Sequence, residues 1–235
     1  MSREPKGIPI SRIGSACLIL LALAGCGERE RSSPLSPGQA YYQALNCRAC
    51  HRIGRSGNAS GPDLTFVGFR HKREWLDLWL SDPNSWKKDA LMPDPDLPEA
   101  TRTAVVDYLV SLKGQAFAGN KPWDDARLTP AQRGSVIFSR VGCSACHGPG
   151  GTGGQPNNNV PGNAIPGLVG VSERYTAGEL AQLIIRGKKP EKEKAAGGEP
   201  LIEMPAWGRV LSDEEIGWVV DYLLTLKDQD TPTGW

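Results

Sequence analysis

The sequence predicts an all-α protein built from two tandem copies of one domain. Its 235 residues are enough for two small domains, and two internal repeats support that division. The motif Cys-x-x-Cys-His occurs at 47–51 and again 96 residues later at 143–147. A ten-residue segment with helical apolar spacing, 104–113, recurs at 218–227, an offset of 114. The halves therefore share one plan, and the second has gained 18 residues between the repeated segments.

The first 25 residues indicate an export signal. Basic residues precede an apolar run at 16–24 that is too short to span a bilayer. The sequence Leu-Ala-Gly-Cys at 23–26 resembles the lipobox of bacterial lipoproteins, in which cleavage leaves an acylated cysteine. We expect 1–25 to be a lipoprotein-type signal peptide, Cys26 to carry the lipid and 26–37 to be a flexible tether. An ordinary secretory peptide or an uncleaved signal anchor is the alternative.

Composition and charge exclude several classes of protein. Apolar residues make up 39% and charged residues 23% of the chain, so neither disorder nor a multi-span membrane protein is expected. Without the first 25 residues, which hold three basic and one acidic residue, the chain carries 24 Lys+Arg and 25 Asp+Glu. This balance gives no basic surface for a nucleic acid, so no nucleic-acid partner is expected.

Each half is expected to contain a helix before its motif, one in the middle and one at its end. Thr129 and Pro130 supply an N-cap and a first-turn proline, and Ser212 opens a capping box. Valine and leucine recur at helical spacing in both final helices, and no strand pattern competes. The predicted helices are 37–45, 72–80 and 104–113 in the first half, and 131–140, 177–186 and one opening at Ser212 in the second.

The cysteines fall into three groups that leave none for a disulfide. One lies in the signal peptide, Cys26 is the lipid site, and four form the two motifs. Cys-x-x-Cys-His is typical of c-type haem attachment, in which both thiols bind the haem covalently and His51 or His147 becomes an axial iron ligand. A thioredoxin-like redox pair does not require the histidine, and a zinc site needs further Cys or His nearby. We predict two covalently bound haem c groups, attached at Cys47, Cys50, Cys143 and Cys146.

Two methionines are candidates for the second axial ligand. Met92 lies 41 residues after His51 and Met204 lies 57 after His147, and each is followed by proline. The chain after the signal peptide has no other methionine, so one per haem is the economical assignment. Methionine otherwise serves mainly as core filler. His71 lies among charged residues and has no counterpart in the repeat, so a solvated surface histidine is expected there.

Together these features resemble the class I cytochrome c family over 38–227. The resemblance implies two tandem cytochrome c-type haem domains, at 38–114 and 129–230, joined by a linker at 115–128. It also implies that a proline carbonyl accepts a hydrogen bond from each axial histidine, and that a glycine allows the first and last helices to cross closely. The tandem arrangement resembles the dihaem c4 type. The matching positions are Pro62 and Pro166, Gly38 with Tyr42, Gly134 with Phe138, and Tyr108 with Tyr222.

Three further features receive structural or docking interpretations. The stretch 148–162 is rich in Gly, Pro and Asn but lacks a Gly-Lys-Ser/Thr ending, so a surface loop is expected. The run 188–194 holds four Lys and two Glu, which are solvated or help to dock an acidic redox partner. Trp86 and Trp207 are expected to pack as core aromatics near each methionine.

With histidine and methionine on each iron, no coordination position is open for a substrate. The sequence therefore predicts a non-enzymatic carrier of single electrons on the periplasmic side of a bacterial membrane. The expected partners are a quinol oxidoreductase on one side and a terminal oxidase, periplasmic reductase or dehydrogenase on the other. The alternatives are a cytochrome subunit of a larger oxidoreductase complex and a dihaem peroxidase-like enzyme in which one iron opens.

Overall fold

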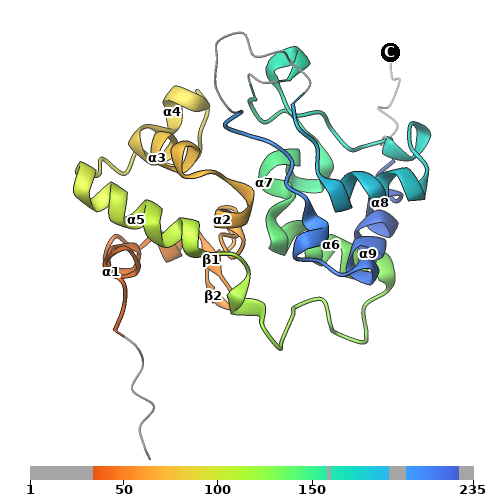
Figure 1. The fold of residues 1–235 in the computed structure, drawn as a ribbon, viewed down its shortest axis with the longest axis horizontal. Helices are drawn as coiled ribbons and strands as arrows, with labels where there is room; N and C mark the ends of the chain where they lie inside the picture. The colour runs from red at the N-terminus through yellow and green to blue at the C-terminus, as the bar shows by residue number, and fades with distance from the viewer. Residues whose placement is uncertain (1–33, 158–159, 191–199, 228–235) are drawn as a thin grey trace, which may run out of the picture. The chain divides into compact units, whose positions relative to one another are not determined.

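A computed structural model describes residues 34–157, 160–190 and 200–227 of the chain (Figure 1). The described residues are mainly helical, as predicted, and those from Leu35 onward form one compact unit that includes both halves. The signal peptide, Cys26 and most of the 26–37 tether lie outside the described residues. No helix in the described ranges is long and apolar enough to cross a membrane.

The first half contains the three predicted helices and two shorter ones. The side chain of Ser36 accepts a hydrogen bond from the backbone N–H of Gln39, and Pro37 occupies the first turn. These two residues are typical of a helix start, and the first helix begins at Pro37. The elements are α1 (Pro37–Ala44), the 3₁₀ turn η1 (Cys47–Ala49), α2 (Val67–Arg70), α3 (Arg73–Ser81), α4 (Pro83–Trp86) and α5 (Glu99–Ser111).

The second half repeats this plan with capping boxes at three helix starts. The side chains of Thr129, Thr176 and Ser212 each accept a hydrogen bond from the backbone N–H three residues later. The side chain of that later residue accepts one from the backbone N–H of the capping residue. The elements are α6 (Pro130–Ile137), a π-helical turn η3 (Phe138–Gly142), α7 (Ser144–His147), the 3₁₀ turns η4 (Pro149–Gly151), η5 (Pro161–Asn163) and η6 (Val171–Glu173), α8 (Ala177–Arg186), η7 (Trp207–Arg209) and α9 (Asp213–Leu223).

The first and last helices of each half cross closely (Figure 1). A Cβ atom at Gly38 would lie 1.9 Å from the carbonyl oxygen of Ala104 on α5, and one at Gly134 would lie 1.8 Å from that of Trp218 on α9. Both distances are far below van der Waals contact, so only glycine fits either crossing. The aromatic pairs at the crossings are Tyr42 with Tyr108, 5.7 Å between ring centroids, and Phe138 with Tyr222, 5.3 Å.

One short strand pair follows the first motif, although the sequence analysis predicted no strands. β1 (Arg52–Ile53) pairs antiparallel with β2 (Ser56–Gly57). Each strand has two residues, which is too few to show the alternation by which strands are recognised in a sequence. Gly54 in the turn has φ 58°, a conformation that favours glycine.

Buried hydrophobic residues form two clusters, one of which joins the halves. The first cluster lies within the first half, between α2, α3 and α5. The second lies between α6, α8 and α9 and also takes in Phe66 from the first half and Phe117 and Trp123 from the 115–128 segment. Trp123 is 1% exposed, and its Nε1 donates to Oε1 of Glu215 at 2.5 Å. The segment between the halves, expected from the sequence to be a linker, is therefore packed against the second core.

Candidate haem sites

The first Cys-x-x-Cys-His motif lies on η1 and the turns that flank it. Asn46 has φ 56°, and this left-handed residue separates α1 from η1. Nδ1 of His51 lies 2.9 Å from the carbonyl oxygen of Pro62, as expected for a ring nitrogen that donates to this carbonyl. A Cβ atom at Gly61 would lie 2.7 Å from the imidazole, so this glycine makes room for the ring. Nε2 is then the nitrogen that can bind a metal.

The second motif lies on α7, directly after the π-helical turn. Gly142 has φ 95° and occupies the position of Asn46 in the repeat. Nδ1 of His147 lies 3.4 Å from the carbonyl oxygen of Pro166, which is longer than the matching distance in the first half. Ile165 stands where the first half has glycine. The two imidazoles are therefore held by the same kind of contact, more tightly in the first half.

The first pair of cysteines is less buried than the second. Cys50 is exposed, whereas Cys47, Cys143 and Cys146 are partly buried. Burial raises the pKa of Cys143 to about 12 and also raises the pKa of Cys146, while the charge of Arg70 from the first half opposes both shifts. Burial likewise lowers the pKa of His147. Contact with the first half thus gives the second motif a drier environment.

The two methionines pack against different cores. Met92 lies against the first cluster together with Leu64, and its Sδ accepts a hydrogen bond from Nε1 of Trp79 at 3.0 Å. Met204 lies against the second cluster, which Cys143 also contacts. Its backbone pairs with Lys188 through two 3.0 Å bonds, which fixes the methionine beside the end of α8. Trp79 was not singled out from the sequence, although its position four residues after Trp75 on one helix was a signal.

Several observations show that these residues fit haem c rather than a bare metal ion. Within the described ranges, no group of three or more His, Cys, Asp or Glu could hold a metal ion, which argues against a zinc site. The four motif cysteines form no disulfide. Two buried donors, Nε of Arg70 and Nε1 of Trp75, have no hydrogen-bond partner in the described part of the chain. Haem carries propionate carboxylates, and buried donors of this kind suit a carboxylate.

His71 is buried, so the expectation of a solvated surface histidine was wrong. It is 9% exposed, and its ring stacks on Trp75 with 3.9 Å between centroids. The charged neighbours suggested a surface segment, but Arg70 is itself buried at the contact between the halves. Burial, together with the adjacent positive charge of Arg70, lowers the pKa of His71 well below its ordinary value.

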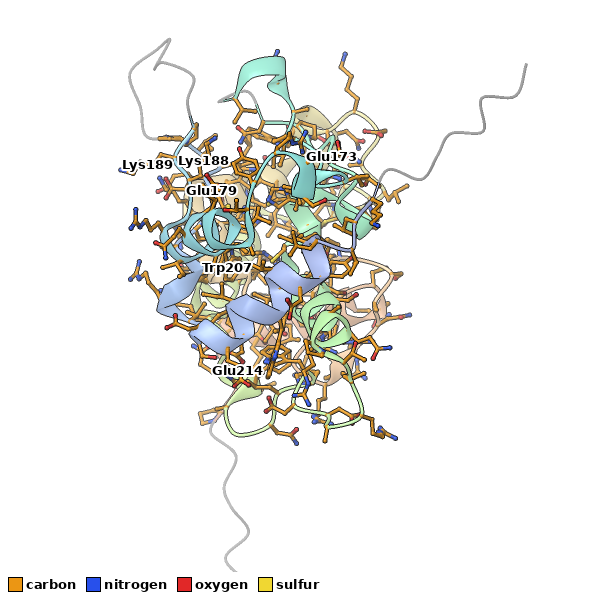
Figure 2. The ribbon with its side chains drawn as sticks, turned by 90° about the vertical axis from the view of Figure 1, so that its right-hand side faces the viewer. Glu173, Glu179, Lys188, Lys189, Trp207 and Glu214 are labelled. Carbon is orange, nitrogen blue, oxygen red and sulfur yellow. The ribbon has the colours of Figure 1, made fainter. Side chains whose placement is uncertain are left out.

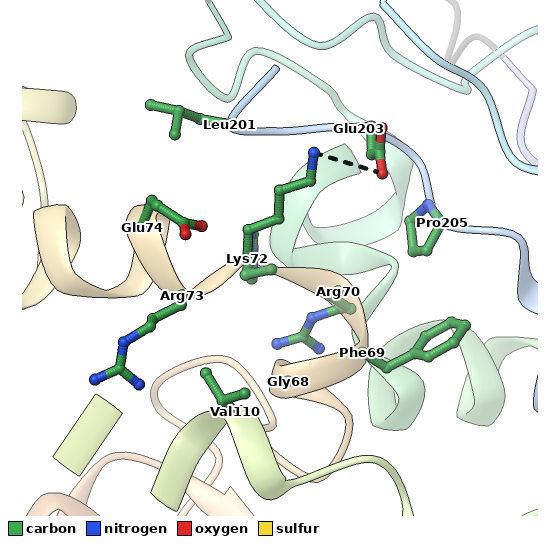
Figure 3. Close-up of a pocket in the computed structure, with 11 residues that line it drawn as sticks. Gly68, Phe69, Arg70, Lys72, Arg73, Glu74, Val110, Leu201, Glu203 and Pro205 are labelled. Atoms are coloured by element: carbon green, nitrogen blue, oxygen red, sulfur yellow. Dashed lines mark ion pairs between the residues drawn. The ribbon is translucent and has the colours of Figure 1, made fainter. Parts of the chain in front are cut away.

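A cavity of about 340 Å³ lies where the segment between α2 and α3 meets the residues around Met204 (Figure 3). Arg70, His71 and Lys72 line it from the first half, and Glu203 and Pro205 line it from the second. Figure 3 shows the ion pair between Lys72 Nζ and Glu203, which are 4.0 Å apart. The residues before Met204 therefore contact the first half.

The structure also describes the two tryptophans and part of the lysine-rich run that the sequence analysis singled out. Trp207 is buried at 3% exposure against Phe66 and Phe69, as expected of a core aromatic, whereas Trp86 is only half-buried and packs on Trp75. Lys188 and Lys189 are exposed next to α8 (Figure 2). Residues 191–194 lie outside the described ranges, so docking by the whole lysine-rich run remains a prediction.

Comparison with known protein families supports this assignment of the motifs. The model of the Cytochrome c family matches the chain twice, over residues 35–113 and 131–227. One solved structure, the reducing HAO-like protein complex of Kuenenia stuttgartiensis, aligns over 82% of this chain and 96% of its own at 18% identity, with a TM-score of 0.28. A TM-score below 0.5 does not indicate a shared fold.

Two curated relatives have names that refer to electron transfer. The "Thiosulfate dehydrogenase electron acceptor" of Stutzerimonas stutzeri is 24% identical over 229 residues, which are 95% of this chain and 96% of the relative. "Cytochrome c oxidase subunit 2" of Alkalihalophilus pseudofirmus is 35% identical over 95 residues. That match spans 37% of this chain and only 28% of the oxidase subunit, so it covers one segment of a longer protein.

Proposed function

The chain belongs to the cytochrome c family, and we propose that it is a lipid-anchored dihaem cytochrome that passes single electrons between redox proteins at the periplasmic side of a bacterial membrane. Membership of this family implies covalently bound haem c and electron transfer. The observation that carries the dihaem proposal is the duplicated site: each half has a Cys-x-x-Cys-His motif whose histidine meets a proline carbonyl, and each has one Met-Pro pair.

Each residue of the duplicated site has a defined role in this proposal. Cys47 and Cys50, and likewise Cys143 and Cys146, would bind the haem covalently as thioethers. The carbonyls of Pro62 and Pro166 hold Nδ1 of His51 and His147, which would leave Nε2 of each ring to bind the iron. Met92 and Met204 would supply the second protein ligand of each iron.

A carrier fits this ligand set better than an enzyme does. Bound haem supplies one-electron oxidation and reduction at iron. The chain's residues would occupy both axial positions, hold the haems at a fixed separation and exclude water from the second site. Because the proposed ligands would leave no iron position for a substrate, the chain would carry electrons without making or breaking bonds in a substrate.

The optical spectrum of the purified protein tests this proposal. Two haems per chain by pyridine haemochrome, both low-spin and both with the weak long-wavelength band of methionine coordination, are expected. Replacing Met92 or Met204 by alanine is expected to remove half of that band and to open one iron to carbon monoxide. An unmodified protein that binds carbon monoxide readily would instead favour the peroxidase-like alternative.

The lipid anchor rests on the sequence around Cys26 and has its own test. Expressed in a bacterium from the full-length gene, the protein is expected to fractionate with membranes and to release an acylated N-terminal peptide at Cys26. A Cys26→Ser variant is expected to be recovered as a soluble exported protein, because two or three acyl chains would hold the unmodified protein at the membrane. Recovery of the unmodified protein in the soluble periplasmic fraction would contradict the anchor.

A fixed subunit of a larger oxidoreductase is the second candidate. The match to an oxidase subunit favours it, whereas the relative that matches along almost the whole chain is named an electron acceptor. In either case the partners are proposed to be redox proteins, such as a quinol oxidoreductase, a terminal oxidase or a periplasmic dehydrogenase. Purification in mild detergent separates the candidates, because a subunit retains stoichiometric partners and a carrier does not.

A further inference from the structure

A cluster of buried charges lies at the contact between the two halves. Asp63 is 8% exposed and Arg70 is 7% exposed, and both belong to the first half. Arg140 reaches them from the π-helical turn of the second half, and its side chain is 15% exposed. The cluster therefore holds two cations and one anion. Charges this deeply buried are retained only when they are paired and hydrogen-bonded.

The carboxylate of Asp63 is held from both halves. Nε of Arg140 lies 2.8 Å from Oδ2 of Asp63, and the same guanidinium also donates to the carbonyl of Gly54. The backbone N–H of Thr65 donates to Oδ1 of Asp63 at 2.8 Å, and the Thr65 hydroxyl donates to it at 2.5 Å. Both oxygens of the carboxylate thus have partners, so its position is fixed.

Arg70 hydrogen-bonds both to the backbone of Asp63 and to the backbone just before the second Cys-x-x-Cys-His motif. Its Nη2 donates to the carbonyl of Asp63 at 3.0 Å, and its Nη1 donates to the carbonyl of Val141, also at 3.0 Å. Val141 precedes Cys143 by two residues. A Cβ atom at Gly142 would lie 1.3 Å from Nη1 of Arg70, so the contact requires glycine there.

This cluster is adjacent to the first axial histidine. Asp63 follows Pro62, whose carbonyl oxygen lies 2.9 Å from Nδ1 of His51. The negative charge of Asp63 is therefore one peptide unit from the group that orients this ligand. A negative charge near an iron centre favours its oxidised form, and a positive charge favours its reduced form.

The repeat shows that the pair is specific to this contact. Aligned on the Cys-x-x-Cys-His motifs, Arg140 corresponds to Ala44, and aligned on the prolines, Asp63 corresponds to Gly167. Neither counterpart can form an ion pair. Asp63 thus has no acidic counterpart in the second half, and Arg140 has no basic counterpart in the first half.

We propose that Arg140 and Asp63 are positioning residues that set the reduction potential of the first haem, with the second half supplying the cation that offsets the carboxylate beside Pro62. The inference rests on the proposed function, because it requires a haem at His51. Packing of the second half then tunes the haem of the first.

The test compares variants of the full-length holoprotein by spectroelectrochemical titration. Arg140→Gln removes the cation and is expected to lower the potential of the first haem. Asp63→Asn removes the anion and is expected to raise it. Each change should alter the reduction equilibrium at least threefold, about 28 mV for one electron. Arg140→Lys keeps the charge and should stay within threefold of the unmodified protein.

Two additions make the result unambiguous. A Met204→His background, in which a second imidazole lowers the potential of the second haem, separates the two waves. The control is Arg127→Gln, which breaks the exposed pair between Arg127 and Asp125, 2.7 Å apart, and should shift neither wave. Opposite shifts from the two main variants support the proposal, because a loss of packing alone would move both in the same direction.

Shifts in one direction, or shifts below threefold, overturn the inference. If Arg140→Gln does not fold, the comparison of Asp63→Asn with Arg140→Lys decides, since one removes a charge and the other keeps it. Haem content and methionine coordination are measured on the same samples. If the variants keep two low-spin haems and their potentials do not change, the inference is wrong but the proposed function stands. If the unmodified protein itself lacks two low-spin haems, the proposed function is wrong as well.

Discussion

The two halves of the molecule share their proposed haem ligands and their helix crossings but differ in what surrounds them. The first motif leaves Cys50 exposed, whereas the second motif lies against the first half. The segment after Pro62 makes this contact through Asp63, Phe66 and Phe69. The residues at the matching positions after Pro166 are two glycines and a glutamate. After duplication, the residues that hold the helices together were kept, while the surfaces around the ligands diverged.

Removing Trp207 should show the largest difference between the halves. Its ring lies 5.1 Å from Phe69 and 6.3 Å from Phe66 between centroids, and it is 3% exposed. Trp207→Ala should cost about 3–5 kcal/mol in the free energy of unfolding, because it leaves a cavity at the contact between the halves. Trp86→Ala, on the half-buried tryptophan of the first half, should cost roughly 1 kcal/mol. Denaturant unfolding of both holoproteins provides the comparison, and equal losses would contradict it.

Arg70 and Arg174 form the next matched pair, since each lies eight residues after its proline. Arg70 makes two charge-assisted bonds to buried carbonyls, whereas Arg174 is exposed and donates to the carbonyl of Gly167 at 3.4 Å. Arg70→Met should destabilise the protein by about 3 kcal/mol and Arg174→Met by less than about 0.5 kcal/mol. The free energies of unfolding of the two variants test this comparison. A small loss for Arg70→Met would mean that the halves pack together without the bond from Arg70 to the carbonyl of Val141.

The helix crossings should show no difference between the halves. A Cβ atom at Gly38 or Gly134 would approach a backbone carbonyl to within 2 Å. Gly38→Ala and Gly134→Ala should therefore each cost about 1–3 kcal/mol, because the backbones must separate. The control is Gly178→Ala on α8, where a Cβ atom would meet nothing within 4 Å and alanine should be neutral or slightly stabilising. Thermal unfolding of the three variants tests the symmetry, and unequal losses at the two crossings would break it.

The sequence predicted what the duplication preserved. Helices with capping residues and helical apolar spacing, such as those that begin after Thr129 and Ser212, could be located because their signals are local. The prolines that face the histidines, and the glycines at the crossings, were found through resemblance to a family rather than through any local pattern.

The contact between the halves could not be predicted in this way. Asp63, Arg70 and Arg140 are charged residues in unremarkable positions, and only the fold brings residues 77 positions apart into an ion pair. A charged segment usually lies at the surface, so the same reasoning placed His71 wrongly. Burial of polar residues at an interface depends on the partner surface, which no single segment encodes.

The smallest expected effect concerns His71, whose counterpart in the second half is Tyr175, exposed at 39%. Burial and the charge of Arg70 lower the pKa of His71 well below its ordinary value of 6.5. Above that value the histidine is neutral in both the folded and the unfolded chain, so it contributes no pH dependence. Below it, the unfolded chain binds a proton that the folded chain does not, and stability falls as the pH falls.

His71→Phe keeps a flat ring to stack on Trp75, 3.9 Å away between centroids, and removes the titrating group. The difference in unfolding free energy between the variant and the unmodified holoprotein should be constant above about pH 7.5. Below pH 6.5 it should shift in favour of the variant by up to about 1.4 kcal/mol per pH unit. Both proteins contain His51 and His147, so the contributions of these histidines cancel. If this difference in unfolding free energy does not change between about pH 7.5 and about pH 5.5, His71 is protonated as readily in the folded protein as in the unfolded chain. That result would support the solvated histidine that the sequence suggested.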